Sequence, residues 1–369
     1  MRVLMLCKDC VAGGTTRHAV DLASDLAERG VEVELVMPAG GHAFEVTEVE
    51  GCRVHRTPSL GRALSTEMSP GAFWLACTRR ADIVHMHIPN PVAACALSLR
   101  SRRPLVITYH CDMDRRFGLP GAMYRAALRR LMRRAATVIL TSESFRESAE
   151  IRAAGARTRV IPLGVRVERL RIEARALALA ETLRRRWGER VVLFVGRLVY
   201  YKGLDVLLRA ARHVDARFVL VGDGPERARL EALAVDLALG TRVEFLGHQE
   251  GSPLVAAYLA ASLVVLPSTG IGESFGQTQV EAALLGKPVV STSLPTGVPW
   301  VNLHERSGLI VTPGDERALA AAFRRLLDDP EYARALGAEG RARAEREFTA
   351  DVMADRTLQL YRDLVGQST

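Results

Sequence analysis

Two acidic residues flank a short glycine-containing segment in the second half of the chain. Glu273 and Glu281 stand eight positions apart around Gly276, after an apolar run at 263–266 that predicts a strand. We expect a helix to start near Gly276 and to stop before Gly286, so that the free N–H groups of its first turn form an anion site suited to a phosphate. A carboxylate beside a phosphate is unfavourable unless it has another task, such as accepting hydrogen bonds from two sugar hydroxyls. Two solvated glutamates on a capped helix explain this segment equally well.

A positively charged pair follows another expected strand, at 191–195. Arg197 and Lys202 are five positions apart on a loop that begins and ends with glycine. At the carboxyl end of a strand, such a pair can neutralise a diphosphate and stabilise the charge that develops on it as a leaving group. A third glycine-rich turn, 13–18, follows the strand at 3–6 and offers backbone N–H groups to a phosphate. The second group favours the phosphate interpretation of the glutamate segment.

These three segments lie at strand-to-helix turns in a chain where strands and helices alternate. Apolar runs predict strands at 3–6, 31–36, 83–86, 105–108, 138–141, 159–161, 191–195, 218–221, 243–246, 263–266 and 289–291. Continuous apolar strands separated by helices indicate a parallel sheet covered on both faces. A polar, arginine-rich stretch at 166–190 interrupts the rhythm, which then restarts and predicts two doubly wound domains, as the length of 369 residues also favours. Neither half carries a Gly-x-Gly-x-x-Gly sequence, which disfavours a nicotinamide-dependent dehydrogenase.

The composition excludes several other classes of protein. With 48% hydrophobic and 25% charged residues the chain is close to the globular average, and it holds no apolar run of the ~18 residues that a membrane span needs. The apolar stretch between Arg2 and Cys7 is too short for the core of a signal peptide, so we expect a cytoplasmic protein with reduced cysteines. Cys7 and Cys10 have thioredoxin-motif spacing, but no second pair completes a four-thiolate zinc site, and we expect neither redox nor metal chemistry there.

The excess of positive charge is concentrated in the first half. The formal net charge is +8, of which 1–165 carries +7 and 166–369 carries +1. A helix-spaced segment supplies five of these arginines, Arg125, Arg129, Arg130, Arg133 and Arg134. They form either a solvated face in a chain that strongly prefers arginine to lysine, or a surface that meets anionic lipid or an anionic acceptor at the inner face of a membrane. Nucleic acid is disfavoured because no binding motif or interleaved aromatic residues accompany them.

Histidines stand at the ends of strands in the first half. His85 and His87 share one face of a strand end, and His110 follows the strand expected at 105–108. A histidine pair by itself is not a zinc site, so we expect no metal there. An ordinary strand-end histidine is the alternative for His110.

The three chemical segments, taken in this order, resemble the retaining nucleotide-sugar glycosyltransferases of family four, which have the two-domain GT-B fold. The glutamates eight positions apart, combined with a Gly-Arg-x5-Gly loop that holds Lys202, form a specific pattern. The resemblance covers nearly the whole chain, including 308–315 and a last helix at 351–364 that packs back on the first domain in this fold. It implies an α/β GT-B fold of two doubly wound Rossmann-like domains, with an acceptor-side domain at 1–166 plus 350–369 and a nucleotide-sugar donor-binding domain at 167–349.

The resemblance also implies roles for individual residues. Arg197 and Lys202 would bind the diphosphate, and Glu281 would hold the ribose hydroxyls. Glu273 and His110 would contact the transferred sugar, so that they and the cationic pair are the expected catalytic residues. The remaining implied contacts are backbone groups around the donor (Gly14, Phe275, Gly276, Gln277, Thr278), the nucleobase edge (His248) and the acceptor side (His87, Arg17).

The implied reaction is the transfer of a hexosyl unit from a nucleoside-diphosphate sugar to a hydroxyl of a glycan or lipid-linked acceptor, with retention at the anomeric carbon and without metal or cofactor. The segments 109–112, 199–203 and 297–302 look similar to enzymes of bacterial surface-polysaccharide synthesis, which favours GDP-mannose as donor. UDP-glucose and UDP-N-acetylglucosamine, with a small-molecule acceptor, remain open. Two rival functions stand beside this one: a nucleotide-sugar epimerase of the same fold and a non-enzymatic protein that binds sugar nucleotides.

Overall fold

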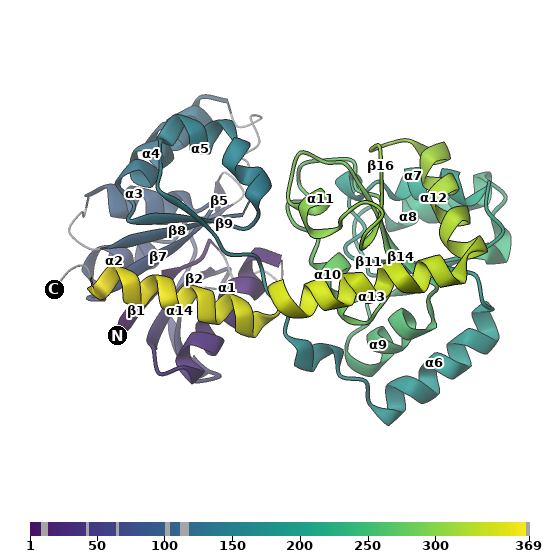
Figure 1. Cartoon of the computed structure of the whole chain (residues 1–369). Helices are drawn as coiled ribbons and strands as arrows, with labels where there is room; N and C mark the ends of the chain where they lie inside the picture. Colours follow the sequence, from purple (N-terminus) through teal and green to yellow (C-terminus); the bar gives the residue numbers. More distant parts are fainter. Residues whose placement is uncertain (9–13, 42–43, 64–65, 100–103, 111–117, 367–369) are drawn as a thin grey trace. The chain divides into compact units, whose positions relative to one another are not determined.

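A computed structural model describes residues 1–8, 14–41, 44–63, 66–99, 104–110 and 118–366 (Figure 1). The chain divides into two compact units: unit 1 is Met1–Gly164 with Ala350–Thr369, and unit 2 is Val165–Thr349. Each unit is built on a largely parallel sheet with helices, the architecture expected from the sequence. The boundaries predicted after residues 166 and 349 lie within two residues of these limits.

The sheet of unit 1 has eight strands in the order β10-β9-β8-β7-β1-β2-β4-β3, and adjacent strands run parallel except β3 and β4. Its strands are β1 (Arg2–Leu6), β2 (Glu32–Ala39), β3 (Glu45–Val49), β4 (Cys52–Pro58), β7 (Ile83–Ile88), β8 (Leu105–Tyr109), β9 (Thr137–Leu140) and β10 (Thr158–Val160). A separate ribbon consists of β5 (Arg62–Ala63) and β6 (Thr66–Glu67). The sequence did not predict β3 and β4, because β3 is largely exposed and β4 alternates polar with apolar residues instead of forming an apolar run.

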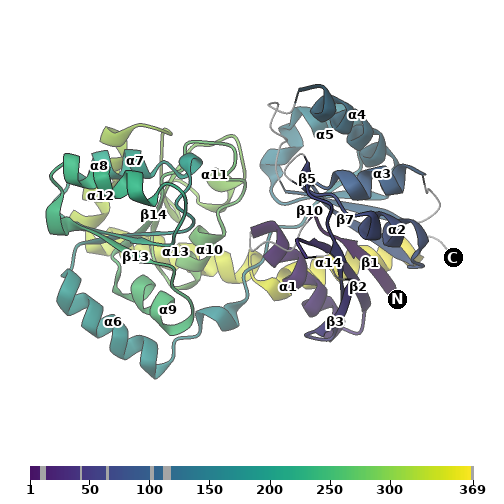
Figure 2. The same ribbon diagram turned by 180° about the vertical axis from the view of Figure 1, so that it is seen from behind.

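Helices cover both faces of this sheet. One core cluster joins it to α1 (Gly14–Glu28) and α14 (Ala350–Gly366), which lie side by side in Figures 1 and 2. The opposite cluster joins it to α2 (Pro70–Thr78), α3 (Pro91–Leu99), α4 (Gly118–Arg134) and α5 (Ala149–Ala154). The side chain of Arg29 donates hydrogen bonds to Asp351 and Asp355 of α14. The last helix therefore returns to pack on unit 1, as the resemblance to GT-B enzymes predicted.

The sheet of unit 2 has six parallel strands in the order β13-β12-β11-β14-β15-β16. They are β11 (Val191–Val195), β12 (Arg217–Val221), β13 (Val243–Gly247), β14 (Leu263–Leu266), β15 (Val289–Thr292) and β16 (Gly308–Val311). One core cluster includes α7 (Leu204–Ala211), α8 (Arg227–Asp236), α12 (Glu316–Asp328) and α13 (Pro330–Glu347). The other includes α6 (Ala174–Trp187), α9 (Gly251–Ala260) and α10 (Gln277–Leu284), so the stretch expected to interrupt the fold at 166–190 contains a helix.

Both sheets reverse their direction of growth at a central strand. In unit 1 the chain passes from β1 to β2 on one side, and β7 lies on the other side of β1. In unit 2 it passes from β11 to β12, and β14 lies on the other side of β11. In each sheet, the connection after the central strand and the connection after its neighbour therefore lead away from each other at the carboxyl edge. Open α/β sheets bind ligands at this point. Lys202 and Glu273 lie in the connections that flank this point in unit 2.

Gly203 allows the connection after β11 to approach β14. Its φ of 65° is left-handed, and a Cβ added there would lie 2.1 Å from the carbonyl oxygen of Pro267, just after β14. Gly155, which ends α5, has the same left-handed conformation, with a φ of 58°, but open space around it. Alanine substitutions at the two positions therefore distinguish the cost of backbone strain from the cost of steric overlap.

We expect Gly203→Ala to lower the free energy of unfolding by about 3 kcal/mol or more, because left-handed strain adds to the overlap with Pro267. The matched control Gly155→Ala should cost only about 1–2 kcal/mol, since left-handed strain acts there alone. Urea unfolding of both variants measures the difference. Equal losses would show that the close approach at Gly203 contributes nothing.

Candidate functional site

A buried ion pair occupies the carboxyl edge of the sheet between β11 and β14. The Nζ atom of Lys202 lies 2.5 Å from Oε2 of Glu273, and the two side chains are 10% and 9% exposed. The hydroxyl of Ser268 donates a hydrogen bond to the same carboxylate oxygen at 3.0 Å. The structure thus brings together two residues, 71 positions apart, that the sequence assigned to one site. Because an ammonium has three donors, its bond to Glu273 leaves donors that a phosphate oxygen can use.

Backbone contacts hold the two loops of this pair together. The carbonyl oxygen of Tyr201 accepts hydrogen bonds from the amides of Thr269 and Gly270, at 2.8 and 3.3 Å. Lys202 ends a single 3-10 turn, η4 (Tyr200–Lys202), directly before α7. A Cβ at Gly196 would lie 3.5 Å from Nζ of Lys202, so the backbone there runs close to the ammonium. The lysine is therefore positioned by its own loop as well as by its partner.

The N-terminus of α10 lies at the same edge. Gly276 precedes it with a left-handed φ of 74°, and a Cβ there would lie 2.5 Å from a methyl carbon of Leu266. The hydroxyl of Thr278 donates to the carbonyl oxygen of Val195, the last residue of β11, at 3.1 Å. These contacts place the first turn of α10 beside the end of β11, where its N–H groups and helix dipole favour an anion.

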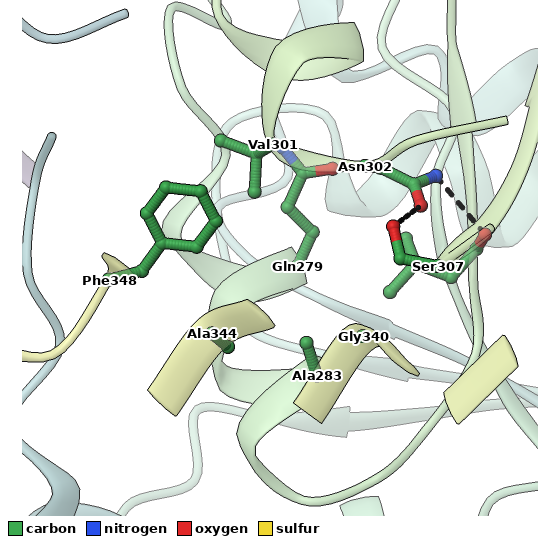
Figure 3. Close-up of a pocket in the computed structure, with 9 residues that line it drawn as sticks. Gln279, Ala283, Val301, Asn302, Ser307, Gly340, Ala344 and Phe348 are labelled. Atoms are coloured by element: carbon green, nitrogen blue, oxygen red, sulfur yellow. Dashed lines mark hydrogen bonds between the residues drawn. The ribbon is translucent and has the colours of Figure 1, made fainter. Parts of the chain in front are cut away.

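Gln279 fixes the turn that starts α10, a role that the sequence did not suggest. Its Nε2 donates to the carbonyl oxygens of Phe275 and Val298, at 2.6 and 3.3 Å. Behind it lies a small pocket whose other lining residues include Asn302, Ser307 and Phe348 (Figure 3). No feature of the sequence distinguished this glutamine from its neighbours.

Glu281 is held by a second buried partner. The hydroxyl of Tyr258, on α9, donates to Oε2 of Glu281 at 2.7 Å. Burial raises the pKa of Tyr258 well above its ordinary value, so the phenol is a constant donor to the carboxylate. Glu281 itself is partly exposed. Tyr258 was not predicted, because within its apolar helix it is indistinguishable from a core residue.

The other predicted donor contacts differ in position. Arg197 is exposed on the loop after β11. The side chain of Phe275 is buried and packs on Phe348, so only the backbone of Phe275 faces the turn. His248 is exposed after β13 and lies 3.0 Å from Glu250. Since β12 separates β13 from β11, the structure places His248 further along the sheet edge than the lysine.

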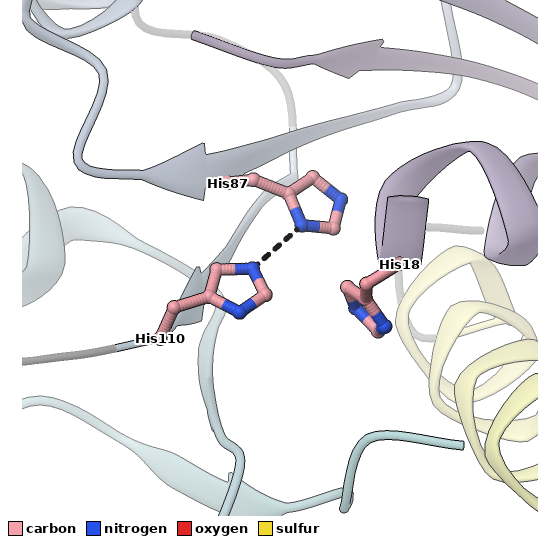
Figure 4. Close-up of side chains that lie close together, drawn as sticks. All are labelled: His18, His87 and His110. Atoms are coloured by element: carbon pink, nitrogen blue, oxygen red, sulfur yellow. Dashed lines mark hydrogen bonds between the residues drawn. The ribbon is translucent and has the colours of Figure 1, made fainter. Parts of the chain in front are cut away.

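In unit 1 the predicted residues gather at the ends of β1, β7 and β8. Gly14 begins α1, Arg17 is exposed on its first turn, and the preceding segment 9–13 with Cys10 lies outside the described residues. His87 and His110 are buried and joined by a hydrogen bond of 3.1 Å between Nδ1 and Nε2 (Figure 4). His18, on α1, packs against both rings at centroid distances of 5.4 and 5.1 Å.

His85 has a different environment from this group. It shares a face of β7 with His87, as predicted, and their rings stack at 4.5 Å. Its Nδ1 lies 2.6 Å from the hydroxyl of Tyr361, and its Nε2 lies 2.6 Å from that of Thr108. Because both nitrogens are occupied, His85 ties β7 to β8 and α14. The cluster of buried histidines therefore consists of His18, His87 and His110. The sequence did not associate His18 with a strand end.

The basic segment forms α4, but its five arginines do not share one exposed face. Arg125 and Arg129 lie 3.9 and 3.7 Å from the carboxylate of Glu150 on α5. Arg130, Arg133 and Arg134 are exposed instead. Arg125 and Arg129 therefore pair with α5, while the other three arginines extend into solvent. Among the described residues, no helix is long and apolar enough to cross a bilayer.

Comparisons with known proteins agree with this architecture. A family model described as Glycosyl transferases group 1 matches residues 179–343, and one described as Glycosyltransferase Family 4 matches residues 12–169. The chain is 32% identical over 353 residues to the D-rhamnosyltransferase WbpZ of Pseudomonas aeruginosa, covering 94% of this chain and 87% of that protein. The chain belongs to glycosyltransferase family 4. The resemblance stated from the sequence is confirmed, and the activity is glycosyl transfer from a nucleotide-sugar donor.

Other relatives of this family 4 glycosyltransferase cover nearly its whole length. The O-antigen chain mannosyltransferase C of Escherichia coli is 28% identical over 358 residues, covering 96% of this chain and 95% of that protein. Among solved structures, sucrose-phosphate synthase of Thermosynechococcus elongatus aligns with a TM-score of 0.83 and 25% identity over all of both chains. The HepE protein of Anabaena, solved with UDP and glucose, aligns with a TM-score of 0.76 and 24% identity, covering 98% and 99% of the two chains. The GT-B fold is confirmed.

The buried pair predicts an asymmetric effect on stability. Glu273→Gln should lower the free energy of unfolding by about 3–5 kcal/mol, because it leaves the Lys202 ammonium buried without a counter-charge. The double replacement Lys202→Met with Glu273→Gln should recover part of this loss, since no unpaired charge then remains. Urea unfolding at neutral pH measures each variant.

Glu339→Gln is the matched control, because its pair with Arg306 is exposed and should contribute at most about 1 kcal/mol. A Glu273→Gln variant as stable as this control would show that the buried pair does not stabilise the fold.

Proposed function

We propose that this enzyme transfers a hexose with retention of configuration, with mannose from GDP-mannose as the best candidate. The acceptor is a hydroxyl of a glycan or lipid-linked molecule in the synthesis of cell-surface polysaccharide or glycoconjugate. The observation that carries the proposal is the buried Lys202–Glu273 pair beside the N-terminus of α10. The names of relatives support the sugar and acceptor, since they include an O-antigen chain mannosyltransferase and a phosphatidyl-myo-inositol mannosyltransferase.

In the proposed donor complex, unit 2 holds the nucleoside diphosphate. The Lys202 ammonium, the Arg197 guanidinium and the amides from Gly276 to Thr278 meet the phosphate oxygens. Glu281, oriented by Tyr258, accepts hydrogen bonds from the ribose hydroxyls. His248 meets the edge of the nucleobase. Glu273 accepts hydrogen bonds from hydroxyls of the sugar while it balances the charge of the lysine.

The proposed chemical step is a displacement on one face of the sugar. The bond between the anomeric carbon and the phosphate oxygen breaks, and a bond from the acceptor oxygen to that carbon forms on the same face. The leaving phosphate takes the proton of the acceptor hydroxyl. Negative charge grows on the diphosphate in the transition state, and the preorganised cations and helix amides stabilise it there. This stabilisation is the function that a metal ion would otherwise supply, so we propose that the step needs neither metal nor cofactor.

Unit 1 supplies the acceptor side in this proposal. Gly14 contributes a backbone N–H to the donor, and Arg17 and His87 face the acceptor. Burial lowers the pKa of His110 well below its ordinary value, with a further contribution from neighbouring histidines. A neutral imidazole can exchange hydrogen bonds with a sugar hydroxyl without carrying charge. His110 is therefore assigned to orienting the donor sugar.

A UDP-glucose-dependent reaction is the second candidate. A 2-deoxystreptamine glucosyltransferase of Streptomyces kanamyceticus is 30% identical over 322 residues, covering 78% of this chain. HepE was also solved with UDP-glucose. A comparison of donors separates these candidates directly.

Incubation with GDP-mannose, UDP-glucose or UDP-N-acetylglucosamine, without acceptor, should give slow release of nucleoside diphosphate, fastest from GDP-mannose. Lys202→Ala and Glu273→Gln should lower this rate at least ~100-fold, because each disrupts the charge arrangement at the leaving group. Omission of Mg²⁺ and Mn²⁺ should leave the rate unchanged. Release is measured at a temperature where circular dichroism shows each variant to be folded.

Arg306→Ala and Glu339→Gln are controls for the loss of one partner of an exposed pair and should keep the parental rate. Full activity of Lys202→Ala or Glu273→Gln would remove that residue from the mechanism. A requirement for a divalent cation would contradict the role of the cationic pair. Conversion of the donor to an epimer would identify an epimerase.

The exposed arginines of α4 support a second part of the proposal, peripheral contact with an anionic membrane that carries a lipid-linked acceptor. Arg130, Arg133 and Arg134 are exposed together with Met123, which is 67% exposed. Basic residues beside an apolar side chain suit the interface of an anionic bilayer. The arginines that pair with Glu150 are excluded from this contact.

Reversal of Arg130, Arg133 and Arg134 to Glu should weaken sedimentation with vesicles that contain phosphatidylglycerol at least ~10-fold, because three favourable charges become repulsive. Reversal of the exposed Arg171, Arg175 and Arg185 in unit 2 changes the net charge equally and serves as the control. Equal binding by both triple variants would end the proposal of contact through α4.

A further inference from the structure

Three buried histidines in unit 1 come from three separate segments of the chain. His18 lies on α1, His87 is the penultimate residue of β7, and His110 follows β8. When one ring nitrogen is taken from each histidine, the three nitrogen atoms lie within 4.8 Å of one another (Figure 4). The group spans the carboxyl ends of β7 and β8 and the start of α1, beside the point where the sheet of unit 1 reverses its direction of growth.

Two nitrogens of this group are buried without a hydrogen-bond partner among the described residues, Nδ1 of His18 and Nε2 of His87. A buried polar atom without a partner costs about 1–3 kcal/mol, so native structures rarely keep one without a reason. Two such atoms in one cluster of three rings point to a ligand that accepts electron pairs or forms hydrogen bonds.

The neutral state of these rings matches the form that binds metals. Burial lowers the pKa of His18 to about 4 and lowers the pKa of His87 and His110 well below the ordinary value. A metal ion binds the lone pair of a ring nitrogen, which is available in the neutral ring and not in the protonated one. Mg²⁺ and Ca²⁺ prefer oxygen ligands, whereas Zn²⁺ and its neighbours accept imidazole.

We propose that His18, His87 and His110 form a binding site for a divalent transition-metal ion of the Zn²⁺ class, with three imidazole ligands and one open coordination position. Tetrahedral Zn–N bonds of about 2.1 Å would place the nitrogens about 3.4 Å apart, so small side-chain rotations must close the site. This departs from the expectation of no metal, which among the histidines considered only His85 and His87. His85 stays outside the site because both of its nitrogens are bonded to hydroxyls.

The proposal shares His87 and His110 with the proposed sugar transfer, which assigns them to the acceptor side and to the donor sugar, so a bound ion would lie where those contacts are placed. The site belongs to unit 1, whereas the Lys202–Glu273 pair that is assigned to the diphosphate belongs to unit 2. Direct metal binding tests it without any measurement of activity.

The full chain is stripped with EDTA, dialysed and titrated with Co²⁺ and with Zn²⁺. We expect one Co²⁺ per chain with the intense visible absorption of four-coordinate cobalt and without a thiolate-to-cobalt charge-transfer band. Zn²⁺ should displace the Co²⁺ and raise the melting temperature, since it binds only the folded protein. Calorimetry gives the Zn²⁺ affinity of each variant.

His18→Gln and His87→Gln should each weaken Zn²⁺ binding at least ~100-fold. His213→Gln, which changes an exposed histidine of unit 2, is the matched control and should bind like the parent. Circular dichroism of the metal-free variants checks the fold, and His18→Gln tests the site alone if His87→Gln does not fold. The proposal is overturned if the parent binds no Zn²⁺, if a folded His18→Gln variant keeps its affinity, or if a charge-transfer band assigns the ion to cysteine.

Discussion

The buried ion pair between Lys202 and Glu273 is the constraint on which the proposed donor site depends. Neither charge is stable in its environment without the other, because each side chain is about nine-tenths buried. The pair requires the loops after β11 and β14 to meet, and Gly203 and the bonds to the Tyr201 carbonyl oxygen permit that approach. The protein thus maintains a positive group beside the N-terminus of α10 without an uncompensated buried charge. A diphosphate that binds there adds negative charge where donors are already oriented.

The two units apply one topological principle to different chemistry. Each sheet reverses its growth beside its central strand, and each presents its polar residues at the carboxyl ends of the strands there. In unit 2 these residues are a lysine, an arginine and two glutamates, which suit phosphates and sugar hydroxyls. In unit 1 they are neutral, buried histidines that stack and bond with one another. The difference lies in the residues that follow the strands, since both sheets bury largely apolar strands in the same way.

The sequence predicted the parts of the fold that depend on local pattern. The apolar runs at 191–195 and 263–266 coincide with β11 and β14, and the glycine at 276 marked the start of α10. β3 and β4 were missed because they lack such runs. The assignment of Lys202 and Glu273 to one site came from chemistry and resemblance, but their mutual bond could not be inferred from residues 71 positions apart.

The contacts that the sequence did not reveal are all tertiary. Tyr258 orients Glu281 across a helix pair, and Gln279 holds the turn at Gly276, but each is an unremarkable residue in its own segment. His18 joins His87 and His110 only because α1 returns to the ends of β7 and β8. Side-chain partners of this kind are fixed by packing between elements, which spacing along one element does not encode.

Recognition of the diphosphate by Lys202 is tested most directly by calorimetric binding of GDP and of GMP to the parent and to Lys202→Met. The two nucleotides differ by the β-phosphate alone, so their comparison isolates the contact in question. We expect the substitution to weaken GDP binding at least ~10-fold, about 1.4 kcal/mol, and to change GMP binding less than ~2-fold. Equal weakening of both nucleotides, or of neither, would show that Lys202 does not recognise the diphosphate.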